Sequence, residues 1–272
     1  VALYEERYGD ERRLQYIPSP EDFATLDTDG VERVWRDRFG DASGWVFAFS
    51  GDFDEDELVD LARRYVGTLP ATGRDENWVD VESPPPAGIV ERTVEAGTGA
   101  QGALNVLYTL PVASIEPLDV AAAAVVTQLL TTRLTDDIRE ELGESYSPFA
   151  AVSIYGDPEP VVETYVSVTG APDRIGSISG FVQDDVGALR ADGPSQTEFD
   201  TAVEQVRRDL ELFSDGQLID EILTAEVEGV VDLEDFADQG VALEQLTIDD
   251  VREFVTAYLP ADHYIQITVL PR

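Results

Sequence analysis

Several side chains that carry common catalytic chemistry are absent from this chain. It has no Cys, no Met and a single His, and every one of its 18 Lys-plus-Arg positions is an Arg. The lack of Cys excludes disulfides, thiolate zinc sites and cysteine nucleophiles. The lack of Lys excludes a phosphate-loop lysine, a kinase strand lysine, Schiff-base chemistry and a Ser-Lys dyad.

The single histidine, His263, excludes the zinc motifs that need two histidines, His-Glu-x-x-His and His-x-x-Glu-His. A Ser-His-Asp triad would depend on His263 alone, in the turn before the last expected strand, and no Gly-x-Ser-x-Gly segment is present. We therefore interpret His263 as a solvated turn residue. We predict no metal site and no complete catalytic site in this segment.

Two further motifs have plain structural explanations. The acidic run 52–57 (DFDEDE) has Glu57 and Arg63 where an EF-hand loop needs Gly and Glu, and acids before a helix are explained by capping and the helix dipole. The glycine-rich run 97–102 has no basic residue nearby and is predicted to be a turn between strands. With 56 acidic residues, carboxylate pairs of almost any spacing occur by chance.

The acidic excess gives a formal net charge of −38. Such a field repels phosphate backbones and anionic lipids, so we expect no nucleic-acid partner. No stretch approaches the roughly 20 apolar residues that span a bilayer, so we expect no membrane insertion. The composition indicates adaptation to high salt, with a high-GC genome as the alternative. The absence of Met leads us to expect an excised segment or processed product.

The order of predicted elements indicates an α+β fold, with a mixed sheet covered on one face by helices. We expect strands at 89–95, 103–110, 149–154, 161–168 and 264–270. We expect helices at 117–142, 172–190, 195–213, 215–228, 233–239 and 249–259. The long helix carries one apolar face, formed by Val126, Leu129, Leu130, Leu134 and Ile138.

An internal repeat defines the domain organisation. Residues 31–49 can be laid over residues 251–269 at an offset of about 220, and each stretch reads as an amphipathic helix, a polar turn and an alternating strand. A chance match of such patterns is the alternative. We interpret residues 1–80 as the end part of a preceding unit, residues 71–87 as a Pro-rich linker, and residues 88–272 as a complete unit.

The most informative pattern is Arg139 and Tyr146, seven residues apart in 139–146 (REELGESY) at the end of the long helix. Seven residues approach two helical turns, so both side chains can reach one surface, and Gly143 is the expected helix stop. A guanidinium and a phenol together can hold an oxygen that gains negative charge during a reaction. The plain alternative is a surface Arg paired with a carboxylate and a Tyr closing the core.

The segment 129–146 (LLTTRLTDDIREELGESY) resembles the C-terminal half of the insulinase-like (M16, pitrilysin-type) zinc metallopeptidases. The resemblance continues upstream in 45–52 (WVFAFSGD) and 62–70 (ARRYVGTLP), which look like that family's strand, helix and Gly-x-Leu-Pro exit. Downstream, 169–173 (TGAPD) and 193–199 (GPSQTEF) look like its later helix starts. Together these motifs cover nearly the whole chain.

The resemblance implies duplicated units, the first of them incomplete here, that form half of a clamshell around a peptide. It implies that Arg139 and Tyr146 bind the substrate's scissile carbonyl, opposite a zinc ion and a general base in an N-terminal half that this chain lacks. The expected partners are that half, on the same chain or as a separate subunit, and a peptide substrate. Taken alone, the segment is expected to be inactive as a peptidase.

An alternative of a different class stays open: a non-catalytic structural or assembly subunit of the same fold. The inactive partners of processing peptidases and the core proteins of respiratory complexes are of this kind. The location also stays open, with a periplasmic or otherwise extracytoplasmic one favoured over a cytoplasmic one.

Overall fold

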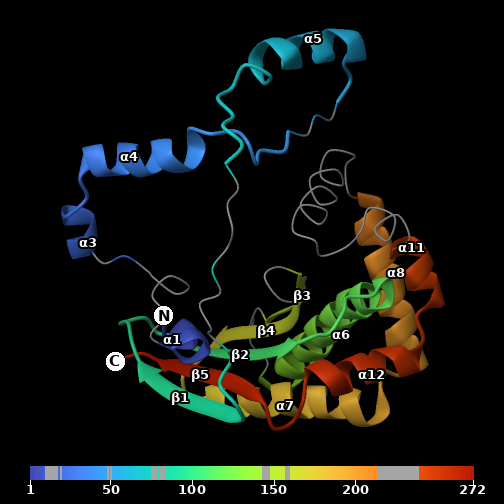
Figure 1. The fold of residues 1–272 in the computed structure, drawn as a ribbon. Helices are drawn as coiled ribbons and strands as arrows, with labels where there is room; N and C mark the ends of the chain where they lie inside the picture. Colours follow the sequence, from blue (N-terminus) through green and yellow to red (C-terminus); the bar gives the residue numbers. More distant parts are fainter. Residues whose placement is uncertain are drawn as a thin grey trace.

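The computed structural model describes residues 1–9, 18, 20–47, 49, 51–74, 79, 84–142, 148–156, 160–212 and 239–272. The described part consists of one sheet unit, residues 84–272, and an arm, residues 20–74, that stands away from it (Figure 1). A short N-terminal helix, α1 (Ala2–Tyr8), lies on the sheet unit.

The sheet has five strands in the order β1-β5-β2-β4-β3. Their bounds are β1 Ile89–Glu95, β2 Gly102–Pro111, β3 Phe149–Tyr155, β4 Val161–Gly170 and β5 Tyr264–Leu270. β1 pairs with β5 in parallel, and the other three pairings are antiparallel. This mixed sheet and all five strand positions confirm the sequence prediction.

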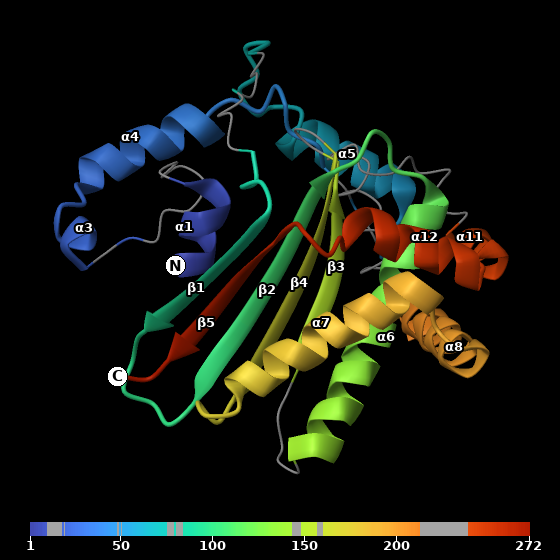
Figure 2. The same ribbon diagram turned by 90° about the horizontal axis from the view of Figure 1, so that it is seen from below.

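Helices cover one face of the sheet. They are α6 (Pro117–Leu142), α7 (Ile175–Asp192), α8 (Gln196–Leu212), α11 (Gln239–Gln245) and α12 (Ile248–Tyr258). Figure 2 shows α6, α7 and α12 against the sheet, with α1 on its other side. The α+β class with one helix-covered face is therefore confirmed. The expected helix at 215–228 lies outside the described residues, and so does the expected helix at 233–239 except for Gln239, which begins α11.

The core lies between this helix layer and the sheet. The strands contribute alternate residues such as Leu104, Val106 and Tyr108, because successive side chains of a strand point to opposite faces. The five residues predicted for the apolar face of α6 are all buried, with exposed fractions of 2% or less. None of the helices in the described part of the chain is both long and apolar enough to cross a membrane.

The arm contains α3 (Pro20–Ala24), α4 (Thr28–Phe39) and α5 (Glu55–Tyr65), and none of these three helices has a buried residue. The strand predicted at 45–49 is wrong for the residues described there, 45–47 and 49, which are in no strand. A strand needs a neighbouring strand for its backbone hydrogen bonds. The described arm contains no strand that supplies them.

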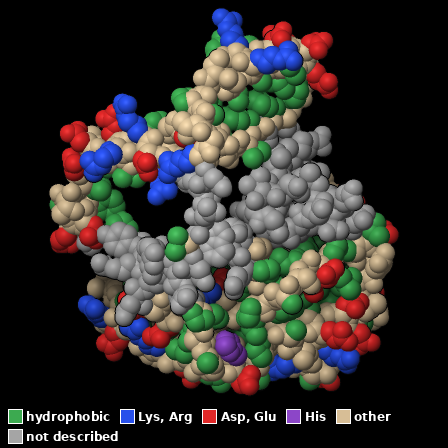
Figure 3. All heavy atoms as spheres, in the orientation of Figure 1, with side chains coloured by type: hydrophobic (Ala, Val, Ile, Leu, Met, Phe, Trp, Pro, Cys, Tyr) green, Lys and Arg blue, Asp and Glu red, His purple; other side chains and the backbone are tan. Residues whose placement is uncertain are grey.

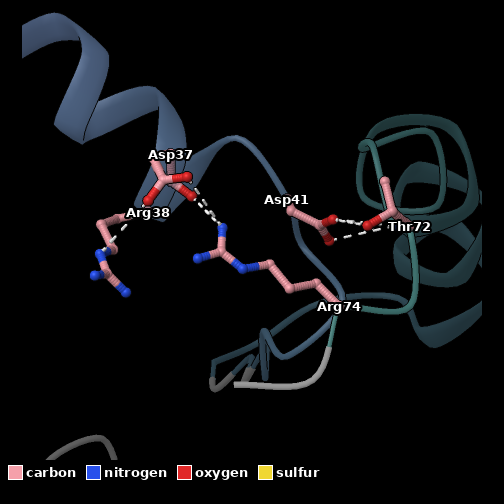
Figure 4. A network of polar contacts seen from close by, with 5 residues as sticks. All are labelled: Asp37, Arg38, Asp41, Thr72 and Arg74. Carbon is pink, nitrogen blue, oxygen red and sulfur yellow. Dashed lines mark hydrogen bonds and ion pairs between the residues drawn. The ribbon is translucent and has the colours of Figure 1, made fainter. Parts of the chain in front are cut away.

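Local polar contacts join the C-terminal end of the arm to the turn after α4 (Figure 4). The Asp41 carboxylate accepts hydrogen bonds from Ser43 and from Thr72, and these bonds lower the pKa of Asp41 to about 2. Arg74 lies 3.7 Å from the Asp37 carboxylate and donates to the Asp37 carbonyl. The start of the linker is thereby fastened to the turn after α4.

Candidate functional site

Arg139 lies in the last turn of α6, and its side chain is exposed. Its neighbour Ile138 is buried, which fixes the orientation of the turn and directs position 139 away from the core. Tyr146 and the predicted helix stop Gly143 lie outside the described residues. The structure thus places one member of the predicted pair on the surface, and the pairing itself stays a prediction.

The middle of α6 is held by a partly buried ion pair. Arg133 Nε lies 2.7 Å from Glu198 Oε1 of α8. Ser195, the residue before α8, donates its hydroxyl to the other oxygen, Oε2, of Glu198 at 2.6 Å. Burial of Glu198 opposes its ionisation, but the hydrogen bonds from Arg133 and Ser195 outweigh it and lower its pKa to about 2.

One turn further along α6, the carboxyl group of Asp137 lies close to that of Asp185 of α7. Asp185 of α7 is 7% exposed, and one of its oxygens, Oδ2, has no hydrogen-bond partner among the described residues. Burial first, and then the neighbouring carboxyl of Asp137, raise the pKa of Asp185 to about 7.

Sequence reasoning missed this acidic pair, although a signal for Asp185 exists. It shares one stripe of α7 with Ile178, Val182 and Leu189, which are all buried. When the helix positions three and four residues away from an Asp are apolar, the Asp lies on the same face as they do and is expected to be buried with them.

The face of the sheet opposite the helix layer carries a polar and aromatic group that we call the sheet-face patch: Asn105, Phe149, Tyr165 and Ser167. Tyr165 donates its hydroxyl to Asn105 Oδ1 at 2.6 Å, and Ser167 donates to the same atom at 3.2 Å. Asn105, Ser167 and Phe149 are direct neighbours across β2, β4 and β3. Phe149 is 54% exposed, so an aromatic ring is available beside the amide.

Helix α1 covers the neighbouring part of the same face. Its Leu3 packs with the apolar group formed by Leu107, Ile265 and Ile267. Arg92 of β1 forms ion pairs of 3.0 Å with both Glu5 and Glu6. Helix α1 also reaches β4, where Arg7 lies 3.4 Å from Glu163 and Tyr165 packs on the same apolar group as Leu3. Phe149 of β3 is therefore the exposed member of the sheet-face patch.

No group of three or more His, Cys, Asp or Glu side chains able to hold a metal ion occurs within the described ranges. The described surface carries groups that can bind a ligand. It provides an exposed guanidinium at the end of α6, together with hydrogen-bonding groups and an exposed ring on the sheet.

Comparison with known proteins identifies the family. Residues 36–206 match the family described as the peptidase M16 inactive domain. The chain belongs to this family. A comparison with curated protein sequences finds no match.

Solved structures show the same fold over the whole chain. The periplasmic protease PqqL from Escherichia coli matches with a TM-score of 0.79 and 20% identity, over 100% of this chain and 30% of that one. The ferredoxin protease FusC, solved as a mutant in complex with Arabidopsis ferredoxin, gives 0.76 and 17%, over 100% and 29%. A peptidase M16 inactive domain from Pseudomonas fluorescens gives 0.74 and 17%, over 100% and 64%. The chain thus spans less than two thirds of each of these relatives.

Proposed function

We propose that this chain is the metal-free, C-terminal half of an M16-type zinc peptidase, and that it helps to enclose a peptide substrate. The match of residues 36–206 to the M16 inactive domain carries this proposal. One further observation supports it: structures that share the fold include proteins named as proteases.

In this proposal the zinc ligands and the general base belong to an N-terminal half, on the same polypeptide or on a separate subunit. Zinc hydrolysis requires three protein ligands, a base and an activated water. This chain contributes Arg139 and Tyr146, whose donors bind the scissile carbonyl as its oxygen gains negative charge. The exposed position of Arg139 at the end of α6 is compatible with this role.

The sheet-face patch extends the proposed peptide surface. Figure 2 shows that α6 ends at the same end of the sheet at which β3 begins, so the Phe149 end of the patch and Arg139 lie at one end of the unit. The amide of Asn105 and the hydroxyl of Ser167 can exchange hydrogen bonds with a peptide, and Phe149 can pack on an apolar side chain.

The experiment uses this chain combined with the zinc-carrying half. The chain alone is expected to hydrolyse no peptide. In the combined enzyme, Arg139→Ala should lower kcat by about 10²–10³, because removing one donor to a developing oxyanion has an effect of this size. Arg207→Ala, which removes an exposed Arg of α8, is the matched control and should leave kcat unchanged.

Chelator-sensitive hydrolysis by the purified chain alone would contradict the proposal that the zinc ligands and the general base belong to another half. If Arg139→Ala unfolded the chain and left turnover per folded molecule intact, Arg139 would be structural. Tyr146→Phe removes one hydroxyl and should reduce kcat less than Arg139→Ala does.

The second candidate is a structural or assembly subunit of the same fold, which the family description of an inactive domain equally fits. The sequence encoded next to this chain distinguishes the two candidate functions. A His-x-x-Glu-His segment upstream, or in an adjacent reading frame, would favour the peptidase, and its absence from both places would favour the assembly role.

The same proposal includes a domain division and a location. Residues 1–80 would be the end part of a preceding unit, residues 71–87 the linker, and residues 88–272 the complete unit. A periplasmic location is supported by the similarity to the periplasmic protease PqqL. Fractionation of the native cells would test the location.

A further inference from the structure

Two polar contacts hold the C-terminal half of α6 before the helix reaches Arg139. The first is the ion pair of Arg133 with Glu198 of α8, in which 2.7 Å separate Nε from Oε1. The second is the approach of the Asp137 carboxyl group to that of Asp185 on α7. Asp137 precedes Arg139 by two residues, which is about 3 Å along the helix axis, so a movement of the backbone at Asp137 also moves Arg139.

The two contacts respond differently to pH. The pKa of Glu198 is about 2 and an Arg side chain stays protonated, so the ion pair keeps both of its charges in neutral solution. The pKa of Asp185 is raised to about 7, by burial first and by Asp137 second. Of the two contacts, only that of Asp137 with Asp185 therefore changes its charge near neutral pH.

The burial of Asp185 gives this change a structural consequence. Acidic side chains lie scattered over the surface of the sheet unit in Figure 3, where water hydrates them. Asp185 is instead 7% exposed, and its Oδ2 atom has no hydrogen-bond partner among the described residues. A carboxyl group that keeps its proton can donate it to a neighbouring carboxylate in a charge-assisted hydrogen bond. Without the proton the site holds two desolvated negative charges, which repel each other.

The other charges near Asp185 do not remove this repulsion. Arg133 of α6 attracts the Asp185 carboxylate, but its guanidinium is already bonded to Glu198. Asp184, the neighbour of Asp185 on α7, adds a further negative charge. The elements α12, β2 and β4 also pack on α7, and among the described residues they contribute none of the charges that act most strongly on Asp185.

Helix α6 is the element that can yield when the two carboxylates repel. On α7, Asp185 is followed by Val186 and Leu189, which are at most 1% exposed. On α6, Ile138 is the last buried side chain among those that the structure describes, and Arg139 after it is exposed. The carbonyl groups of a last helical turn also lack the intrahelical partners of earlier turns. We therefore expect repulsion to move the end of α6 and not α7.

We propose that Asp137 and Asp185 are positioning residues for Arg139. While the two carboxyl groups share a proton, they hold the last turn of α6 against α7 and keep Arg139 at the proposed active site. When that proton leaves to solvent, the last turn separates from α7 and Arg139 moves away from the scissile carbonyl. This inference rests on the proposed role of Arg139 and adds a pH-dependent control of it, which weakens as the pH rises through about 7.

Amide hydrogen exchange on this chain alone tests the structural step. Protection factors, corrected for the pH dependence of intrinsic exchange, are compared at pH 5.5 and pH 8.5 for residues 134–142. Each pKa unit by which release lowers the pKa of Asp185 favours release about tenfold above pH 7. We therefore expect protection at residues 134–142 to fall about tenfold between the two pH values, and to fall less at residues 121–130, which precede the ion pair.

Asp185→Asn removes the titration and keeps a donor, because its amide can bond the Asp137 carboxylate at every pH. Protection at residues 134–142 should then be the same at both pH values. Asp184→Asn, which changes the exposed neighbour, is the matched control and should retain the fall of about tenfold. If Asp185→Asn does not fold, Asp137→Asn replaces it, because its amide can bond the Asp185 carboxylate in the same way.

Turnover in the enzyme combined with the zinc-carrying half tests the link to Arg139. Asp185→Asn should raise the ratio of kcat at pH 8.5 to kcat at pH 5.5 several-fold relative to the unsubstituted enzyme. In an Arg139→Ala background the same substitution should leave this ratio unchanged, because the residue that Asp185 positions is gone. An equal rise in both backgrounds would overturn the positioning role.

The two measurements separate this inference from the proposed function. Exchange at residues 134–142 that is independent of pH, or that changes equally in Asp185→Asn, would overturn the positioning role and leave the proposed function standing. Turnover that is unaffected by Arg139→Ala would overturn the proposed role of Arg139, and the positioning role with it, even where the exchange result holds.

Discussion

Val31 of α4 and Val251 of α12 are the same amino acid and coincide when residues 31–49 are laid over residues 251–269, yet one is 53% exposed and the other is fully buried. Both helices form, because their N-terminal caps and apolar spacing are local signals that need no partner. Burial differs because α12 has a sheet and two helices to pack on. The comparison shows that a sequence segment can specify a helix by itself, whereas the burial of its apolar face depends on the elements packed against it.

The largest expected difference between the copies concerns the centre of the helix. Phe254→Ala should lower the free energy of unfolding by about 3–5 kcal/mol, the usual result of removing a buried ring. The equivalent Val34→Ala should change it by no more than about 0.5 kcal/mol, as exposed substitutions do. Urea unfolding followed by far-UV circular dichroism measures both. Similar losses in the two variants would show that the arm is packed in solution.

The pH dependence of stability tests the packing of the sheet unit, because the carboxyl group of Asp185 is buried there. Its folded-state pKa of about 7 is raised above the ordinary Asp value, so its protonated form favours folding. This contribution is fully present below about pH 4 and is lost as the pH rises through 7, by at most about 4 kcal/mol. Asp185→Asn should therefore make the chain more stable at pH 8 than the unsubstituted protein.

The matched control for Asp185 is its exposed neighbour Asp184. Asp184→Asn should leave the decline in stability between pH 5 and pH 8 nearly unchanged. A decline of equal size in the Asp185→Asn variant would assign the pH dependence to other groups.

Tryptophan fluorescence reports on the arm and linker, because all three Trp residues lie before the sheet unit, at positions 35, 45 and 78. Trp35 and Trp45 are 58% and 44% exposed. Urea should therefore shift the emission of the chain little, while the circular dichroism signal is lost cooperatively as the sheet unit unfolds. A large red shift that coincides with the loss of circular dichroism would mean that the arm is already packed.

Salt should have a smaller, general effect on both copies. The net charge of −38 destabilises a compact state by self-repulsion, which salt screens. The melting temperature should rise with sodium chloride, with most of the gain by about 1 M, where the Debye length is near 3 Å. A melting temperature that stays flat from 0.1 to 2 M would favour the genomic explanation for the acidic composition.

Periodicity and capping were sufficient to predict the five strands and the helices α6, α7, α8 and α12 of the sheet unit, but not α11. The strand at 89–95 and the helix at 117–142 have the predicted bounds, because alternation and a continuous apolar stripe are complete within each segment. The strand predicted at 45–49 was wrong for its described residues, because pairing is non-local and the pattern does not say whether a neighbour is present.

The site was less predictable than the fold. Arg139 lies at the end of the predicted helix, but its role stays a prediction, and the sheet-face patch depends on the register of β2, β4 and β3. That register aligns Asn105, Ser167 and Phe149, and it cannot be read from any one strand. Asp185 was missed because a chain with 56 acidic residues hides one buried acid among many solvated ones.

The most direct test of the account is the matched pair Val31→Ala and Val251→Ala, measured by urea unfolding in this chain and in the polypeptide extended upstream. Val251→Ala removes two buried methyl groups and should lower the unfolding free energy by about 2 kcal/mol in both polypeptides. Val31→Ala should leave the unfolding free energy of this chain nearly unchanged. In the extended polypeptide it should lower the unfolding free energy of the first unit by about 2 kcal/mol. If Val31→Ala is silent in both, the arm is not an incomplete copy of the sheet unit, and the account fails.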